Sequence, residues 1–298
     1  MDFTMALAGL GVGIVVGLTG MGGGALMTPI LVLFFGINPV AAIGSDLVAS
    51  AIMKPFGGAV HAKRGTVNWT LVAWLCAGSV PSAFLGVLLL RAFGDDESLQ
   101  HGVKIALGVA LLLAVGGMLL KAWISRRDGD GPAPAITVKP IPTLLVGIMG
   151  GLVVGLTSVG SGSLIIVALL ALYPMLRAND LVGTDLVQAI PLVTAAALGH
   201  MLFGDMQWGI AGAVVLGSIP GVLIGSRISS RAPGGLVRSA LIIVLLASSL
   251  KLFDLPTMVV GVVAAASVLV AVAVGLIGKS RARRTPAAPE LDREAVSV

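Results

Sequence analysis

Long apolar runs alternate with short polar stretches along this chain, and the lengths of the runs indicate the fold class. A helix rises about 1.5 Å per residue, so about 20 apolar residues cross the ~30 Å hydrocarbon core of a bilayer. Runs of this kind occupy residues 40–62, 67–91, 100–124, 180–203, 208–229, 235–251 and 256–278. The pattern predicts an all-α integral membrane protein, folded as a polytopic helical bundle.

Two further apolar regions, residues 3–35 and 141–173, each contain a glycine-rich interruption. Beyond the interruption only residues 25–35 and 163–173 remain, and as helix each piece spans ~16 Å, half of a bilayer. We expect each region to form a helix, a break and a half-helix, which is either re-entrant or part of a short hairpin. Such backbone is tolerated at membrane depth only where protein or a water-filled cavity satisfies its polar groups.

The two interrupted regions belong to an internal repeat. Gly17–Gly24, with the sequence GLTGMGGG, returns as Gly155–Gly162, with the sequence GLTSVGSG. The numbering offset between the copies is constant through the break and grows by one after it, which indicates a single insertion between the two stretches. The later matches include Asp46 with Asp185, His61 with His200, Trp69 with Trp208, Pro81 with Pro220 and Gly86 with Gly225. A pair of glycine-interrupted segments in matching positions points to the binding site of a transporter.

The distribution of basic residues orients the two halves. If each interrupted region returns to the side from which it enters, one side receives Lys63, Arg64, Lys121, Arg126, Arg127, Arg177, Arg227, Arg231, Lys279, Arg281, Arg283 and Arg284. The positive-inside rule makes this side cytoplasmic. Each half then crosses the membrane an odd number of times, so we expect two inverted-topology repeats, with the N-terminus outside and the C-terminus in the cytoplasm.

This interpretation divides the chain into five parts. They are a first membrane repeat at 1–124, a cytoplasmic linker at 125–140, a second membrane repeat at 141–255, an extra transmembrane helix at 256–278 and a disordered cytoplasmic tail at 279–298. The linker is polar and rich in glycine and proline, which is typical of a flexible connection.

Composition supports a membrane protein and excludes other classes. Hydrophobic residues make up 57% and charged residues 11% of the chain, whereas a soluble domain carries about 25% charged residues. The net charge of +5 comes from basic residues at the ends of apolar runs, so it does not indicate a nucleic-acid partner. The lipid bilayer is the expected environment, and the single cysteine, Cys76, leaves no disulfide within the chain.

Ionisable side chains inside apolar runs mark a candidate site, because inserting one costs about 2.5–3.5 kcal/mol. Asp46, Lys54 and His61 follow one another at spacings of eight and seven residues, near one face of a helix. Val193 stands at the position of Lys54 in the second half, so the cation is present only once. The candidate supporting or coupling residues are Asp46, Ser50, His61, Asp185, Gln188 and His200.

These polar residues also fit purely structural roles. The two aspartates could cap helix N-termini or bind backbone N–H groups at the breaks. The histidines could make hydrogen bonds at the membrane surface, and Lys54 could serve only as an internal partner of Asp46.

The glycine breaks themselves suggest anion binding. A half-helix that begins inside the membrane presents free N–H groups and the positive end of its dipole. The candidate substrate-binding residues are Thr19, Gly20, Met21, Gly22, Gly23, Gly24, Lys54, Thr157, Ser158, Gly160, Ser161, Gly162 and Ser163. We expect no catalytic residue, metal or cofactor. An intramembrane serine protease built on Ser161 and His200 is disfavoured, because Gly23 stands at the position of Ser161 in the first copy.

The duplicated break, the Gly-Ser/Thr-Asp-Leu motif at Gly44–Leu47 and Gly183–Leu186, and the segment His61–Trp69 resemble the sulfite exporter TauE/SafE family. The resemblance covers roughly residues 5–278. It implies a transporter of the bacterial inner (cell) membrane whose partner is a small sulfur-containing anion, such as sulfite or an organosulfonate. Lys54, within Met53-Lys54-Pro55, resembles a subgroup that carries a lysine in this helix.

We therefore expect an alternating-access carrier that exports its anion, since the negative cytoplasm favours outward movement of negative charge. A channel-like anion conductor, a proton-coupled importer and an accessory subunit without transport of its own stay open as alternatives. The sequence does not select the anion or the oligomeric state.

Overall fold

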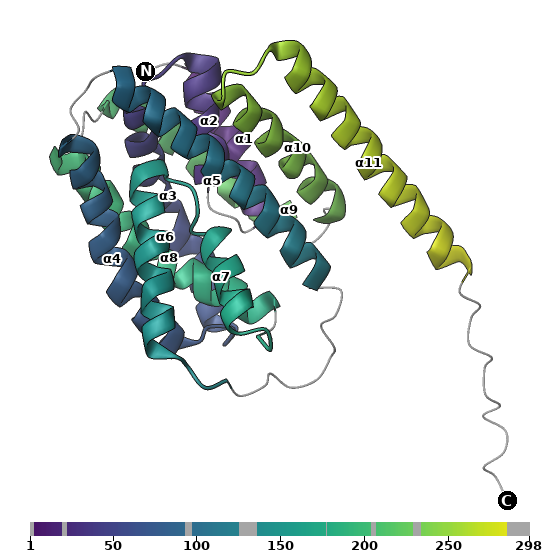
Figure 1. Ribbon diagram of the computed structural model, residues 1–298, viewed down its shortest axis with the longest axis horizontal. Coiled ribbons are helices and arrows are strands. Elements are labelled where there is room, and N and C mark those ends of the chain that lie inside the picture. Colours follow the sequence, from purple (N-terminus) through teal and green to yellow (C-terminus); the bar gives the residue numbers. More distant parts are fainter. Residues whose placement is uncertain are drawn as a thin grey trace, which may run out of the picture.

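The computed structural model describes residues 3–19, 23–92, 97–124, 136–176, 178–203, 207–228 and 234–284. The regular structure within these ranges is helical (Figure 1). The helices of the first half are α1 (Phe3–Thr19), α2 (Gly24–Phe35), α3 (Pro39–Lys63), α4 (Trp69–Ala92) and α5 (Glu97–Ile124). Those that follow are α6 (Pro140–Thr157), α7 (Leu164–Leu172), α8 (Ala178–Phe203), α9 (Trp208–Ile228), α10 (Gly234–Leu252) and α11 (Thr257–Arg284).

Each of the seven long apolar runs forms one helix of the bundle. Within the described part of the chain, six helices are long and apolar enough to cross a membrane, namely α3, α4, α5, α6, α8 and α9. Two of the seven expected spans, residues 235–251 and 256–278, correspond to α10 and α11, which are not among these six helices. The apolar part of α11 is Thr257–Ala273. These findings confirm an all-helical chain suited to a membrane.

The last helix is longer than the sequence interpretation allowed. The tail was expected to begin at residue 279, but α11 continues to Arg284. The segment KSRARR is polar, yet lysine, arginine and alanine all have high helix propensity, so polarity does not end the helix there. Residues 285–298 and most of the linker, residues 125–135, lie outside the described residues.

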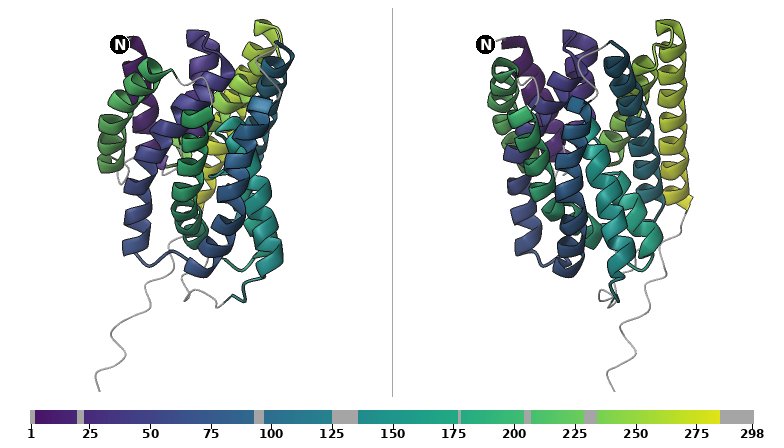
Figure 2. Two further views of the ribbon diagram at one scale, coloured as in Figure 1. Left: turned by 90° about the vertical axis from the view of Figure 1, so that its left-hand side faces the viewer. Right: turned by 60° about the vertical axis from the view of Figure 1, so that its left-hand side comes forward.

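Both interrupted regions contain two separate helices. α1 ends at Thr19 and α2 begins at Gly24, while α6 ends at Thr157 and α7 begins at Leu164. α2 has 12 residues and α7 has nine, so they measure ~18 Å and ~14 Å, about half of a bilayer. In Figure 2, α1 and α2 lie toward the end of the bundle that carries the N-terminus, and α6 and α7 lie toward the opposite end.

The closest helix packing joins one helix of the first half with one helix of the second half. α1 packs against α9, and α6 packs against α4, through small residues that bring the backbones together. Gly9, Gly13 and Gly17 of α1 face Val214, Ser218 and Val222, and Gly147, Gly151 and Gly155 of α6 face Leu75, Ser79 and Ala83. The sequence repeat relates the two sets position by position, since α6 is the second copy of α1 and α9 is the second copy of α4. The repeat seen in the sequence is therefore also a repeat of contacts.

The middle of the bundle is formed by α3 and α8, which pack against each other. α3 also contacts α2, α5 and α9, and α8 also contacts α4, α6 and α7. α11 packs against α10 at the edge of the bundle (Figure 1). This arrangement places the polar residues of α3 beside the breaks.

Candidate anion-binding site

The second break is a tight loop whose backbone conformation requires glycine at one position. Ser158 ends α6 in a left-handed conformation, and its N–H donates to the Val154 carbonyl at 2.7 Å. Gly160 has a φ of 129°, which side chains other than glycine rarely adopt. Its carbonyl accepts the N–H groups of Ser163, Leu164 and Ile165 at 3.0–3.3 Å.

A half-helix that begins near residue 163 was expected to leave its own first N–H groups free, but the structure differs. The first amides of α7 are already bound to Gly160. The N–H groups of residues 160–162 have no acceptor within the described part of the chain. These loop amides, rather than the first turn of α7, are available to a ligand.

The start of α2 has the same character. The carbonyl of Gly23 accepts the N–H groups of Leu26 and Met27, both at 2.9 Å. As far as the structure describes the chain, the N–H groups of Gly24 and Ala25 have no acceptor. Gly23 offers no side-chain cap, and Oδ1 of Asp46 lies close to this end of α2.

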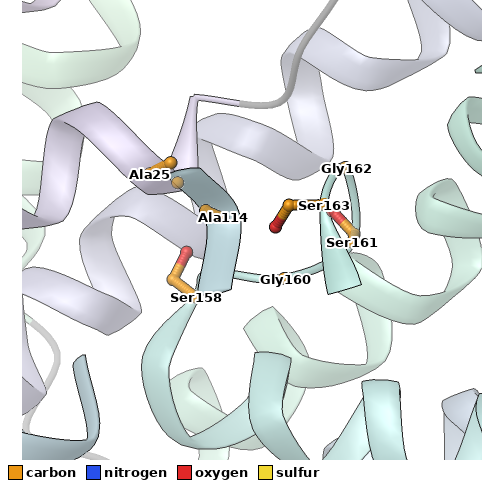
Figure 3. A pocket seen from close by; sticks show the side chains of 8 residues that line it. Ala25, Ala114, Ser158, Gly160, Ser161, Gly162 and Ser163 are labelled. Atoms are coloured by element: carbon orange, nitrogen blue, oxygen red, sulfur yellow. The ribbon is translucent and has the colours of Figure 1, made fainter. Parts of the chain in front are cut away.

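The two breaks meet. A Cβ atom added to Gly24 would overlap the backbone oxygen of Ser158, so only glycine permits this approach. Beside the contact lies a small, open pocket. Figure 3 shows Ala25 and Ala114 on one side of this pocket and the loop of Ser161 to Ser163 on the other. The pocket is lined by Gly24, Ala25, Ala114, Ser158, Gly160, Ser161, Gly162 and Ser163.

Lys54 supplies the positive side chain of this region. It is 6% exposed, and its Nζ donates a hydrogen bond of 2.5 Å to Oγ of Ser161, on the pocket wall. Among the residues that the structure describes, no carboxylate oxygen lies within 4 Å of this nitrogen. Asp185 and Asp46 act on Lys54 only through longer-range attraction. The ammonium group is therefore not committed to an ion pair.

Asp46 connects three elements around the pocket. It is fully buried on α3, and its Oδ2 accepts hydrogen bonds from Thr28 on α2 at 2.9 Å and from Ser158 at 2.5 Å. Buried Ser50 lies one turn further along the same helix. Asp46 and Lys54, both on a helix of the first half, thus contact the second break at Ser158 and Ser161.

The matching residues of the second half form a separate cluster. Nε2 of Gln188 donates to Asp185 at 3.1 Å, and Oε1 of Gln188 accepts from Ser79 at 3.4 Å. Buried His200 has its Nε2 3.3 Å from the Gly155 carbonyl, so it lies inside the bundle rather than at the membrane surface.

His61 lies at the far end of α3, where its Nδ1 is 3.0 Å from Oγ1 of Thr66. Four helical turns separate it from Asp46, a distance of about 22 Å along the helix. The structure therefore does not bring this histidine to the pocket.

Two predicted hydroxyl donors also point elsewhere. Oγ1 of Thr19 donates to the Val15 carbonyl in the preceding turn of its helix. Oγ1 of Thr157 donates to the Val153 carbonyl and accepts the N–H of Val159, without lining the pocket. Gly23 forms the turn before α2 without lining the pocket. The predicted residues Gly20, Met21 and Gly22 lie outside the described residues.

Three residues of the site were not predicted. Thr28 follows Gly24 by one helical turn, so its position on the same face of α2 is a signal that sequence inspection could have used. Ala25 and Ala114 carry no such signal, because an alanine in an apolar helix has no distinctive chemistry.

In the described part of the chain, six helices long and apolar enough to cross a membrane and two interrupted apolar regions indicate a polytopic membrane protein of the transporter type. Comparison with known proteins agrees. The family model described as sulfite exporter TauE/SafE matches residues 5–252, so the chain belongs to this family. α11 begins beyond the matched region.

Curated relatives carry matching names. A "Probable membrane transporter protein YjnA" of Bacillus subtilis is 41% identical over 255 residues, which are 85% of this chain and 100% of that protein. A "Probable membrane transporter protein" of Xylella fastidiosa is 28% identical over 76% of this chain and 84% of its own length. A relative of that description from Methanocaldococcus jannaschii is 30% identical over 68% of this chain and 73% of its own length. No solved structure matches the chain significantly.

Proposed function

We propose that this chain is a carrier that exports small sulfur-containing anions, such as sulfite or organosulfonates, and binds them between the two breaks. The observation that carries the proposal is the pocket where the start of α2 meets residues 158–163. Membership in the TauE/SafE family supports the choice of cargo class.

The pocket offers the groups that a small oxyanion needs. Both breaks contribute N–H groups without an acceptor among the described residues, the dipole of α2 adds positive potential, and hydroxyls come from Ser158, Ser161 and Ser163. Lys54 adds a full charge through its contact with Ser161. Hydrogen bonds that involve a charged partner contribute about 1.5–3 kcal/mol each. Lys54 and the loop amides are therefore the main determinants of affinity.

The pairing of helices supports alternating access by inverted repeats. α1 with α9 and α4 with α6 are tightly joined across the halves by glycine contacts, so each pair is suited to move as a unit. The placement of α1 and α2 at one end and of α6 and α7 at the other favours opposite orientation of the halves (Figure 2). The breaks then act as re-entrant segments around a fixed site near the bilayer midplane.

The charge of the cargo favours export from a bacterial cell. Moving one negative charge outward gains about 2.3 kcal/mol per 100 mV of membrane potential, and a divalent anion gains about twice as much. The basic residues near the ends of α3, α5 and α9 favour an outer N-terminus and a cytoplasmic C-terminal end in the inner membrane.

Transport by the purified chain in liposomes tests the proposal. A carrier shows counterflow, in which unlabelled sulfite or isethionate on one side drives entry of the labelled anion from the other, and its rate saturates with cargo. Single-channel currents would favour a conductor instead. Absence of flux for both anions would contradict the proposed function.

A further inference from the structure

Asp46 has an unequal set of contacts for a buried carboxyl group. Two hydroxyls, from Thr28 and Ser158, donate to Oδ2. Oδ1 has no hydrogen-bond partner among the described residues, and neither has the buried Oγ of Ser50. A carboxylate oxygen that is removed from water without a partner retains an uncompensated desolvation penalty. Oδ1 is therefore a position where a ligand would bind favourably.

A proton fits this position better than a metal ion. Hard cations such as Ca²⁺ require six to eight oxygen ligands, whereas only two oxygens here lack partners in the described structure. No group of three or more His, Cys, Asp or Glu residues that could hold a metal occurs within the described part of the chain. A proton needs one lone pair, and it turns the carboxylate into a neutral group that tolerates burial.

Two titratable side chains, Asp46 and Lys54, hydrogen-bond to residues of the pocket wall. α3 packs against α2, α5, α8 and α9. The charged or titratable neighbours are Lys54 on the same helix and Asp185 and His200 on α8, and His200 packs against the backbone of α3 at Gly44. Arg227 lies in the last turn of α9 and is exposed.

On α5, Glu97, His101 and Lys104 lie near the N-terminal end, away from Ala114, which lines the pocket, and Lys121 follows Ala114 by about two turns. α2 contributes the hydroxyl of Thr28 and no charged residue. Among the described side chains, only Asp46 combines a carboxyl oxygen without a partner and a direct hydrogen bond to a residue of the pocket wall.

Ser158 links the carboxyl group to the anion pocket. Its hydroxyl donates to Asp46, and the same residue lines the pocket. Protonation of Asp46 would remove a negative charge close to the anion and weaken its hold on the Ser158 hydroxyl, which could then donate to the anion. Binding of a proton and binding of an anion would therefore favour each other.

We propose that Asp46 is the proton-binding group of the carrier, and that a proton on its Oδ1 travels together with the anion. The inference rests on the proposed function. With a monovalent sulfonate the pair carries no net charge, so the pH gradient sets the direction and an acidic exterior drives entry; proton coupling therefore restricts the proposed export to divalent sulfite. With divalent sulfite one negative charge stays uncompensated, and the membrane potential still favours export.

Proteoliposomes with labelled isethionate, a sulfonate whose charge does not change with pH, test the coupling. With an acidic exterior, the unmodified protein should accumulate isethionate at least tenfold above the level reached without a gradient. A pH dye trapped inside should report proton entry that depends on isethionate. Asp46→Asn imitates the protonated group, so the rate of its counterflow should no longer change with pH, and it should lose both gradient-driven effects. Asp185→Asn is the matched control and should keep them.

The outcomes separate this inference from the proposed function. Counterflow by the unmodified protein without proton entry would overturn the inference and leave the carrier intact. Gradient-driven accumulation by Asp46→Asn, or sodium-driven accumulation by the unmodified protein, would also overturn it. If neither isethionate nor sulfite shows counterflow, the proposed function itself fails.

A second variant covers the case in which Asp46→Asn does not fold. Thr28→Val removes one hydroxyl that stabilises the ionised carboxylate. The pH at which uptake is half-maximal should then rise by about one unit. An unchanged midpoint in this variant would contradict the role of Asp46.

Discussion

The first break, with the sequence Gly20-Met21-Gly22-Gly23-Gly24-Ala25, offers little besides backbone, whereas the second, Ser158–Ser163, carries three serines. Both interrupt a long apolar region and are followed by a half-length helix. Their supports differ, because α3 holds the second break through Asp46 and Lys54, while α8 has Val193 at the position of Lys54. The repeat thus supplies the glycine-rich interruption twice and the lysine once.

The largest effect should follow from separating the two breaks. A side chain at Gly24 collides with the backbone of Ser158, so Gly24→Val should reduce anion flux more than a hundredfold. Gly11→Val is the control, since a Cβ at Gly11 on α1 meets no atom within 4 Å. Initial rates in proteoliposomes, normalised to inserted protein, measure both. Normal flux in Gly24→Val would show that the contact between the breaks is dispensable.

Replacing Lys54 with valine, the residue at the matching position of the second half, should have the next largest effect on the anion site. Lys54→Val copies Val193 and removes the buried charge beside Ser161. A lost charge-assisted interaction of about 1.5–3 kcal/mol weakens sulfite binding by roughly 10- to 150-fold. Thermal stabilisation by sulfite measures the affinity. Lys251→Val is the control, because this exposed lysine hydrogen-bonds to Thr257 and does not line the pocket. Equal affinity in both variants would remove Lys54 from the site.

Replacing Ser161 with glycine, the residue at the matching position of the first break, should have a smaller effect on cargo affinity. Ser161→Gly copies Gly23 and takes away the hydroxyl that accepts from Lys54. A hydrogen bond contributes about 0.5–1.5 kcal/mol, so the half-saturating cargo concentration should rise about two- to tenfold. Concentration series of uptake determine this value. A fall instead of a rise would indicate that Ser161 competes with the anion for Lys54.

The smallest effect should come from a charge pair far from both breaks. Asp254 accepts a hydrogen bond from Lys104 at 2.8 Å, and this contact, followed by the attraction of the lysine charge, lowers the pKa of the aspartate. A lowered pKa means that the pair stabilises the fold above the unfolded-state pKa, and that this contribution is lost as pH falls through the folded-state pKa.

Because the pair is exposed, Asp254→Asn should lower the free energy of unfolding at neutral pH by less than about 1 kcal/mol and leave flux unchanged. Melting curves at several salt concentrations measure this, since salt should reduce the difference between the two proteins. A marked loss of flux would mean that the junction of α10 and α11 takes part in transport.

The sequence predicted the helices and the breaks because both depend on local composition. Run length fixed the position of α3, α4, α8 and α9 to within three residues, and the glycine clusters marked where α1 and α6 end. The end of α11 was placed too early, because polar residues such as Arg283 lack an apolar pattern but still favour a helix.

The polar residues of the site were predicted by type, while their partners were not. The contacts of Lys54 with Ser161 and of Asp46 with Ser158 join residues more than 100 positions apart, so they depend on how α3 packs against the opposite half. Sequence pattern does not determine which way a side chain of a break points.

Electron cryo-microscopy of the chain in lipid nanodiscs with saturating sulfite tests the central claim most directly. The account predicts interrupted helices between residues 19 and 24 and between 157 and 164, with the anion bound by N–H groups of Gly24, Ala25 and residues 160–162 and close to Lys54. Continuous helices through either segment, or an anion bound away from the meeting point of the breaks, would contradict it.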